Sequence, residues 1–217
     1  MVDLDRFVAE TSTQKWFRYL RRRFERDGCV LERVEAPLSS HLLDELAAIS
    51  DGWLTIPGRR ERGFTLGQWS RDYIRLSPVY VVRDRAGVAR AFANVVPSYR
   101  PGEATVDLMR QQPDAVNGTM DFLFTAMMLD LHGRGFRWFS EGLAPFAGVG
   151  EDPDSTIEER AVHELFERLN RLFSYRGLRA YKEKFEPEWE DRFLIYSGGS
   201  IALARVSFAL TRLTADR

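Results

Sequence analysis

Two charged residues lie in a part of the sequence where a β-strand usually excludes charge. The segment from Ala104 to Phe124 opens with alternating apolar and polar residues, which is typical of a strand, and Asp107 and Arg110 fall within that opening. Charged side chains inside a strand need an ionic partner, a ligand or water. A carboxylate and a guanidinium so close in sequence therefore predict a polar site. The alternative is structural, with Asp107 paired to a neighbouring strand and Arg110 solvated.

The spacing of these two residues sets a geometric condition on that site. Side chains alternate across a regular strand, so residues three apart face opposite ways. Asp107 and Arg110 can share one site only if the strand ends or bulges before Arg110. Pro113 and the pair Asn117-Gly118 favour an early end, after which the spacing of Met120, Phe124, Met127 and Met128 indicates a helix.

Composition limits the class of protein. A chain of 217 residues, 44% hydrophobic and 29% charged with a net charge of -1, fits one soluble globular domain. No apolar run is long enough to cross a bilayer and no secretory leader opens the chain, so we expect a cytosolic protein or a soluble part of something larger. The one cysteine, Cys29, excludes an internal disulfide and suits a reducing compartment.

Neither a metal nor a cofactor is predicted. The three histidines, His41, His132 and His163, are scattered along the chain. His163-Glu164 resembles the start of a helical zinc motif, but the second histidine is missing, which favours an exposed helix face.

The segment from Thr13 to Asp27 is predicted to be a basic amphipathic helix. Trp16, Leu20 and Phe24 recur at helical spacing and form one apolar stripe, and the rest is densely cationic. Such a face attracts an RNA backbone or an anionic membrane surface; the alternative is a merely solvated face. The candidate polyanion-binding residues are Lys15, Arg18, Arg22, Arg23 and Arg26.

The remaining pattern predicts an α/β (α+β) domain with a mixed central sheet flanked by helices. Strands are expected at 29–35, 79–83, 88–96, from 104, at 136–140 and at 192–196, and helices at 39–53, 68–76, from 119, at 156–173 and from 200 to about 213. This order resembles the acetyltransferase-type (GNAT) fold, so residues 1–28 are predicted to be a basic linker helix and 29–217 a GNAT-like catalytic domain. In that fold the loop before the helix that follows the fourth strand holds coenzyme A. The equivalent loop here, Gln111 to Gly118, has one glycine and an acid, which argues against an acyl-CoA site.

Several sequence blocks resemble one family. D-L-M-R followed by N-G-T-M-D-F-L, then F-S-E-G-L-A-P-F-A-G, then Y-R-G-L-R-A-Y-K-E-K-F-x-P-x-W-E are similar to the catalytic region of bacterial aminoacyl-phosphatidylglycerol synthases, the multiple peptide resistance factor family. Ile49 to Leu54 and Glu61 to Gly67 look similar too. The resemblance spans nearly the whole chain, in order. One departure is Glu141, where the family usually has a residue other than an acid.

The resemblance implies transfer of an aminoacyl group from aminoacyl-tRNA to a hydroxyl of phosphatidylglycerol at the inner face of the cell membrane. Family catalytic regions consist of two GNAT-like halves joined by a positively charged helix. This chain begins at that helix and carries the second half, so an N-terminal GNAT-like half and a membrane-spanning portion are expected elsewhere. An activated ester mainly needs positioning, deprotonation of the acceptor and oxyanion stabilisation.

The resemblance implies that Asp107, Arg110 and Lys182 are functionally important, and their separate roles are our hypothesis from residue chemistry. Asp107 would act on the attacking hydroxyl or the α-amino group of the substrate, Arg110 would hold a phosphate, and Lys182 would offset charge at the ester or the terminal nucleotide. Glu61 and Glu141 are weaker candidates for substrate binding, with loop charges as the alternative. The single-stranded tRNA end would stack and pair with Tyr175, Arg176, Arg179, Tyr181 and Lys184. The alternative is a surface helix whose tyrosines pack inward.

Three other functions fit the same sequence. The first is an acyltransferase of this fold with another donor or acceptor, and radiolabelled aminoacyl-tRNA tested against acetyl-CoA would separate the two. The second is a non-catalytic half-domain that recruits tRNA or membrane through the basic helix and binds without turnover. The third is a scaffold, which predicts no charge-dependent binding.

Overall fold

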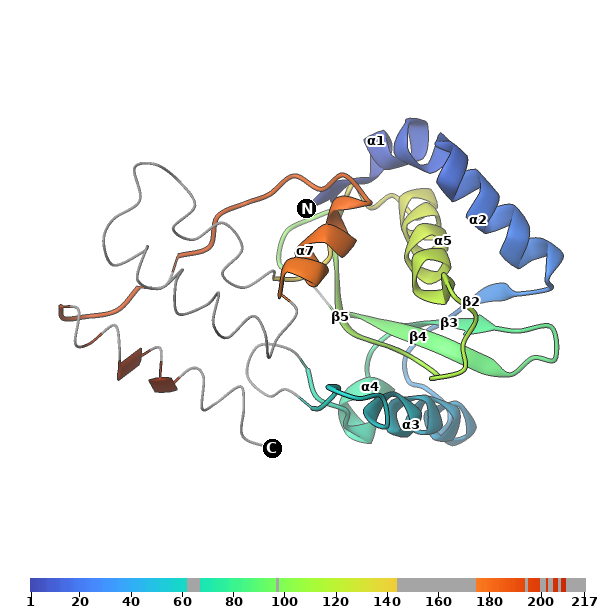
Figure 1. Ribbon diagram of the computed structural model, residues 1–217, viewed down its shortest axis with the longest axis horizontal. Helices are drawn as coiled ribbons and strands as arrows, with labels where there is room; N and C mark the ends of the chain where they lie inside the picture. The colour runs from blue at the N-terminus through green and yellow to red at the C-terminus, as the bar shows by residue number, and fades with distance from the viewer. Residues whose placement is uncertain are drawn as a thin grey trace.

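A computed structural model describes residues 1–61, 67–96, 98–143, 175–193 and 195–199, with 202, 205, 206, 208 and 209. A six-stranded sheet in the order β1-β6-β5-β4-β3-β2 lies between two layers of helices (Figure 1). The strands are β1 (Val2–Asp3), β2 (Val30–Val34), β3 (Val79–Arg83), β4 (Ala89–Val96), β5 (Glu103–Gln111) and β6 (Trp138–Ser140). The helices are α1 (Leu4–Ala9), α2 (Lys15–Arg26), α3 (Ser40–Leu54), α4 (Arg71–Arg75), α5 (Thr119–Gly133) and α7 (Tyr175–Glu183), with a short 3-10 helix at Thr11–Thr13.

The sheet is mixed, as predicted. Strands β2 to β5 pair antiparallel in chain order, α5 then crosses over, and β6 returns parallel to β5. This confirms the α/β class and the GNAT-like order of elements. The N-terminal strand β1, which the sequence analysis missed, pairs antiparallel with β6 and closes that side of the sheet.

The strand predicted at 192–196 is wrong for the residues described there. Arg192, Phe193, Ile195 and Tyr196 are not in strand conformation. A strand exists only if a neighbour offers hydrogen bonds, and the sheet order contains no strand from these residues. The helix predicted at 156–173 and most of the closing helix lie outside the described residues.

Two hydrophobic cores cover the two faces of the sheet. The larger one joins α1, α2 and α5 to the sheet and includes Phe7, Phe17, Phe24, Phe124 and Phe139. The smaller one lies under α3 and α4 and includes Leu46, Ile49, Ile74, Phe92 and Leu108. Strand β3 supplies both, because alternate residues face opposite layers.

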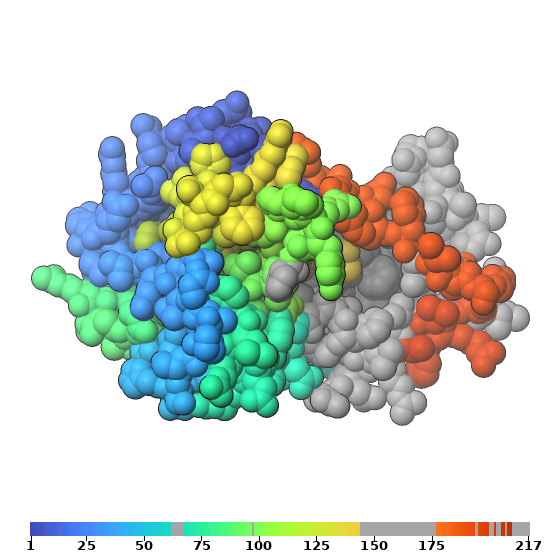
Figure 2. Space-filling model, turned by 180° about the vertical axis from the view of Figure 1, so that it is seen from behind, coloured from blue at the N-terminus to red at the C-terminus, as the bar shows by residue number. Residues whose placement is uncertain are grey.

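Helix α2 packs on this domain through a stripe that differs from the predicted one. Phe17, Leu20 and Phe24 are buried, whereas Trp16 is 47% exposed. The predicted place of Trp16 in the stripe is therefore wrong, because Phe17 takes it and the i, i+3, i+7 spacing still gives one face. The division of the chain at residue 28 stays a prediction. Seen from behind, the blue N-terminal elements and the cyan α3 segment lie toward opposite sides of the molecule (Figure 2).

Candidate functional site

A β-bulge in β5 brings the two predicted charged residues to one face. Ala93 pairs with Met109 and Val95 with Val106, so Asp107 and Leu108 together lie opposite Asn94. The side chain of Asn94 fills the irregularity, because its Oδ1 accepts a hydrogen bond from the Leu108 backbone N–H at 2.7 Å. Ala104 and Val106 consequently face the α5 layer, whereas Leu108 faces the α3 layer.

Asp107 and Arg110 both contact the α3 and α4 layer as a result. The condition for a shared site is therefore met by a bulge rather than by an early end of the strand, since β5 continues to Gln111. That the two residues serve one substrate site stays a prediction.

Two donors hold the Asp107 carboxylate. The backbone N–H of Gly67 donates to Oδ1 at 2.7 Å, and the Tyr73 hydroxyl donates to Oδ2. Burial, and then the bond to Asp107, raise the pKa of Tyr73 to about 12, so this hydroxyl keeps its proton at neutral pH. Gly67 is required by close approach, because a Cβ there would lie 2.0 Å from Oδ2 of Asp107. A carboxylate with two donors retains lone pairs for a substrate hydroxyl or ammonium group.

Arg110 is buried and paired, so the alternative in which it is solvated is wrong. Its side chain is 3% exposed, and its guanidinium forms a bidentate pair with Glu61 at 2.8 and 2.7 Å. The same group donates to Ser50 Oγ at 2.5 Å and lies over the Trp53 ring at 4.7 Å from the centroid. Trp53 and Ser50 come from α3, so this helix fixes the orientation of the guanidinium.

Together these contacts fix the segment from Glu61 to Gly67 at both ends. Arg110 binds Glu61, and Asp107 binds the backbone of Gly67. Glu61 also accepts a hydrogen bond from the Trp69 backbone N–H at 3.4 Å. Residues 62–66 lie outside the described part of the chain. The two charged residues of β5 therefore act as one clamp on this segment.

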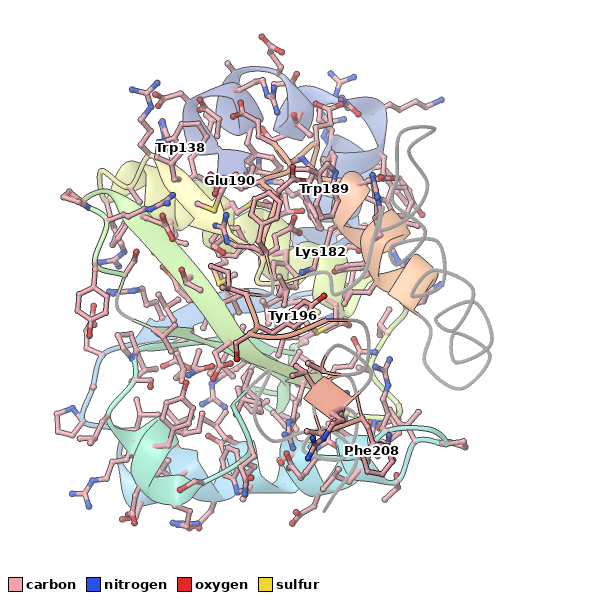
Figure 3. The ribbon with its side chains drawn as sticks, turned by 90° about the vertical axis from the view of Figure 1, so that its left-hand side faces the viewer. Trp138, Lys182, Trp189, Glu190, Tyr196 and Phe208 are labelled. Carbon is pink, nitrogen blue, oxygen red and sulfur yellow. The ribbon has the colours of Figure 1, made fainter. Side chains whose placement is uncertain are left out.

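Lys182 holds a turn on the other side of β5. Its Nζ donates to the backbone carbonyls of Glu141, Gly142 and Leu143 at 2.7, 2.9 and 3.1 Å. The side chain is 4% exposed, and burial lowers the pKa of its ammonium group. In Figure 3 Lys182 lies between α7 and the sheet, near the centre of the view. Three bonds match the three hydrogens of an ammonium group, so Lys182 positions this turn.

The turn lies where β5 and β6 part. The last paired residues of the two strands are Thr105 and Ser140, whereas β5 continues to Gln111. A Cβ on Gly142 would lie 3.9 Å from the carbonyl oxygen of Val106, so the turn runs alongside the residue before Asp107. We call this place, bounded by Val106–Asp107 on one side and Glu141–Leu143 on the other, the fork.

Glu141 is buried at the fork. Glu141 is 6% exposed, so it is not the loop charge that the sequence analysis gave as the alternative. Burial raises the pKa of Glu141 to about 8, although Lys182 and the amino group of Met1 oppose this shift. Among the described residues, no group donates a hydrogen bond to Oε1 of Glu141.

Three of the other predicted residues in and just after α7 contact the rest of the protein. Tyr181 packs inward against Phe124 and Phe185, and Lys184 binds Asp121 at 3.2 and 3.3 Å and lies over the Tyr181 ring. Arg179 pairs with Glu183 at 3.1 Å and lies 5.1 Å from the centroid of the Trp189 ring. The side chains of Tyr175 and Arg176 lie outside the described part. A role of these five residues in tRNA binding stays a prediction.

The basic face of α2 is open to solvent. Lys15, Arg18, Arg22 and Arg26 are exposed, whereas Arg23 is partly buried and donates to the carbonyl of Asn117 at 3.3 Å. Two exposed aromatic rings, Trp16 and Tyr19, lie among these cations with centroids 6.1 Å apart. Cations interleaved with exposed aromatic rings suit unpaired nucleotides or a membrane interface.

The start of α5 is closed to an anion. A helix N-terminus normally attracts phosphate through its free N–H groups. Here Asp121 lies in the first turn, is 7% exposed and pairs with Lys184. Phe24 of α2 stacks on Phe122 with ring centroids 4.7 Å apart, which covers the same end. This arrangement supports the prediction that no conventional acyl-CoA site lies here.

Sequence reasoning missed the partners of the central pair. Gly67 and Tyr73 hold Asp107, and Ser50 and Trp53 hold Arg110. The signal that could have indicated these contacts was the sequence block Glu61 to Gly67, because its first and last residues bind Arg110 and Asp107. None of the helices in the described residues combines the length and apolar character of a membrane span.

Comparison with known proteins gives one consistent result. The family described as "Phosphatidylglycerol lysyltransferase, C-terminal" matches residues 1–196. A phosphatidylglycerol lysyltransferase of Bacillus subtilis is 38% identical over 212 residues, which cover 98% of this chain and 24% of that protein. A phosphatidylglycerol lysyltransferase of Staphylococcus aureus is 33% identical over 196 residues, 90% of this chain and 23% of that protein. The chain thus spans about a quarter of the length of these relatives.

Solved structures agree over the whole chain. The structure of L-PGS from Bacillus licheniformis superposes with a TM-score of 0.82 at 35% identity and covers 100% of this chain and 65% of that one. The C-terminal domain of a putative lysylphosphatidylglycerol synthetase from Agrobacterium fabrum gives a TM-score of 0.79 at 36% identity, with the same coverage of 100% and 65%.

Proposed function

The chain belongs to the phosphatidylglycerol lysyltransferase C-terminal family, and on that premise we propose that it transfers an aminoacyl group from aminoacyl-tRNA to a hydroxyl of phosphatidylglycerol. The observation that carries this proposal is the family match over residues 1–196. The named relatives are lysyltransferases, so lysine is the aminoacyl group we propose.

The proposed reaction suits the residues around the fork. An ester of tRNA is already activated, so the protein has to position it beside the lipid hydroxyl and stabilise the developing charge. Asp107 would accept a hydrogen bond from that hydroxyl, because Gly67 and Tyr73 leave it with free lone pairs. The ester would lie at the fork, where the edge of β5 continues beyond its pairing with β6.

Arg110 and Lys182 fit this scheme as positioning residues. Glu61 already binds both terminal nitrogens of the Arg110 guanidinium group. We therefore assign Arg110 to the clamp on Glu61 to Gly67 instead of to a phosphate. Three carbonyls occupy the ammonium group of Lys182, so we assign Lys182 to the turn at the fork instead of to direct contact with the nucleotide. Removal of the Arg110 side chain would displace the segment that binds Asp107, and removal of the Lys182 side chain would displace the turn at the fork.

The proposed partners are aminoacyl-tRNA and an anionic membrane. The exposed cations of α2 and its rings Trp16 and Tyr19 suit one or both of them. We propose that the protein works at the inner face of the cell membrane, together with an N-terminal half and a membrane-spanning portion such as longer relatives have room for. The closed start of α5 speaks against an acyl-CoA donor.

The test is a reconstituted transfer assay on the longest form of the protein that can be expressed. Radiolabelled lysyl-tRNA is mixed with vesicles that contain phosphatidylglycerol, and the extracted lipid is identified by mass spectrometry. Lysylated phosphatidylglycerol is the expected product, and Asp107→Asn should reduce its rate by about 100-fold or more. Acetyl-CoA with amines serves as the competing donor. Transfer from acetyl-CoA, or tRNA binding without any lipid product, would contradict the proposal.

A further inference from the structure

One buried carboxyl oxygen at the fork lacks a hydrogen-bond partner. Among the described residues, no group donates a hydrogen bond to Oε1 of Glu141. The Tyr181 hydroxyl lies near it but is directed to Asp121: burial, then the charge of Asp121 and a hydrogen bond to it, and last the charge of Glu141 raise the pKa of Tyr181. Buried polar atoms are nearly always paired, so the unpaired oxygen of Glu141 indicates a place for a polar atom of a ligand.

Glu141 is also held rigidly. Lys182 binds the Glu141 carbonyl and the next two carbonyls, and Gly142 has a φ of +76°, which lets these carbonyls converge on one ammonium group. The backbone that carries the carboxyl group is thereby fixed beside β5 at the point where the strand loses its partner. The pairing is to the backbone of Glu141, so the carboxyl group keeps a free oxygen.

We propose that Glu141 is a catalytic acid, which gives its proton to the ribose oxygen that leaves the aminoacyl group. This inference rests on the proposed function. The bond between the acyl carbon and the ribose oxygen breaks as the bond between the acyl carbon and the lipid oxygen forms. The proton of the lipid hydroxyl is released toward Asp107 or water, and the Glu141 carboxylate then takes up one proton from solvent. No oxidant, reductant or further reactant is needed.

The charges around Glu141 suit this role. Burial keeps it protonated at neutral pH, with a pKa of about 8, and a general acid works best near its working pH. The groups that face it are Lys182 and Tyr181 of α7 and the amino group of Met1. Lys182 would stabilise the carboxylate that remains after proton transfer. A protonated acid with a free oxygen is also a hydrogen-bond donor for an oxyanion.

The test compares two donors in a single-turnover assay with phosphatidylglycerol vesicles and the longest form of the protein. One donor is lysyl-tRNA, whose ribose oxygen needs a proton to leave. The other is the para-nitrophenyl ester of lysine, whose phenolate leaves without one. Glu141→Gln should slow transfer from lysyl-tRNA by about 100- to 10,000-fold and leave transfer from the activated ester close to wild type. Glu10→Gln, an exposed acid on the chain, is the matched control.

The pH profile gives a second measurement. The wild-type rate with lysyl-tRNA should fall as the pH rises through about 8, because the acid form is lost, and the Glu141→Gln rate should not show this fall. Glu141→Asp, which keeps a proton to give, should retain partial activity and the fall, and it serves if Glu141→Gln does not fold. Equal losses with both donors, or no loss with lysyl-tRNA, would overturn the inference alone. A wild type that forms no lysylated lipid would overturn the proposed function.

Discussion

Asp107 and Arg110, three residues apart on one strand, hold the two ends of one segment. Asp107 accepts the backbone N–H of Gly67, and Arg110 pairs with the carboxylate of Glu61. Regular alternation would have sent the two side chains to opposite faces, and the bulge opposite Asn94 removes that obstacle. In the described residues, the contacts of Asp107 and Arg110 hold the two ends of this segment. Four measurements test the parts of this arrangement.

Gly67→Ala should disrupt the Asp107 end of the clamp. The new Cβ would lie 2.0 Å from Oδ2 of Asp107, so the segment must move and its hydrogen bond must weaken. We expect a loss of about 1 to 3 kcal/mol in the free energy of unfolding and a slower transfer reaction. Denaturant unfolding and the lipid assay measure the two effects. Gly133→Ala is the control, since nothing lies within 4 Å of a Cβ there; a loss of similar size at Gly133 would contradict the explanation.

The Arg110 end of the clamp should be strongly coupled. Arg110→Ala removes a buried guanidinium and leaves the partly exposed Glu61 without its partner, which should cost up to about 3 kcal/mol of unfolding free energy. A double-mutant cycle with Glu61→Gln should show coupling on the order of 1 to 3 kcal/mol. Arg110→Lys should recover little, because an ammonium group cannot form the bidentate pair. Arg100→Ala removes an exposed cation that lies 4.0 Å from Glu103 and 3.7 Å from Glu190, and it should change stability by less than about 1 kcal/mol. Additive effects of the Arg110 and Glu61 variants would refute the clamp.

Glu141 should make stability depend on pH. Its pKa rises from the ordinary 4.5 to about 8 on folding, so the folded state holds a proton that the unfolded state releases. The stabilisation from this proton is complete below pH 4.5 and is lost as the pH rises through about 8. The loss is at most about 5 kcal/mol. Glu141→Gln should therefore flatten the dependence of unfolding free energy on pH in this range, as urea titrations at several pH values would measure. Glu10→Gln should keep the wild-type curve, and a Glu141→Gln curve of the same slope would argue against a buried protonated acid.

Charge reversal on α2 should weaken binding in a salt-dependent way. Arg18→Glu and Arg22→Glu remove exposed cations, and each lost phosphate contact should reduce the slope of log affinity against log salt by about 0.7 to 0.9. Fluorescence binding to tRNA and to vesicles of anionic lipid, measured separately, shows which of the two partners uses this face. Arg85→Glu makes the same charge change in the exposed turn between β3 and β4. Equal effects at Arg85 and at α2 would mean that only net charge matters.

Much of the fold follows from patterns that the sequence displays. The continuous apolar run from Val79 to Val82 predicts a strand buried on both faces, and the helical spacing of Leu42, Leu46 and Ile49 predicts one buried helix face, as the structure has them. Asp107 and Arg110 were recognisable because charge is rare in strands. The sequence could not show whether the strand bulges or ends early, because a hydrogen bond from the neighbouring strand, made by the side chain of Asn94, determines this.

The errors have the same origin in tertiary structure. The segment at 192–196 has strand-forming residues, but none of those that the structure describes pairs with the sheet. β1 and α1 were missed because two and six residues carry almost no periodic signal. Trp16 and Phe17 are both aromatic, so only the packing of α2 on α5 determines which is buried. Glu141 looked like a loop charge because its burial depends on α7, some forty residues later, and on Lys182.

The occupied start of α5 affects which small molecules can bind the protein there. Asp121 and Lys184 neutralise each other where related folds receive a phosphorylated carrier, and α2 lies across the opening. A phosphorylated carrier such as coenzyme A therefore finds no free phosphate site at this helix end. If the proposed function holds, we expect the transfer rate to respond to the concentrations of aminoacyl-tRNA and acceptor lipid, and not to that of acyl-CoA.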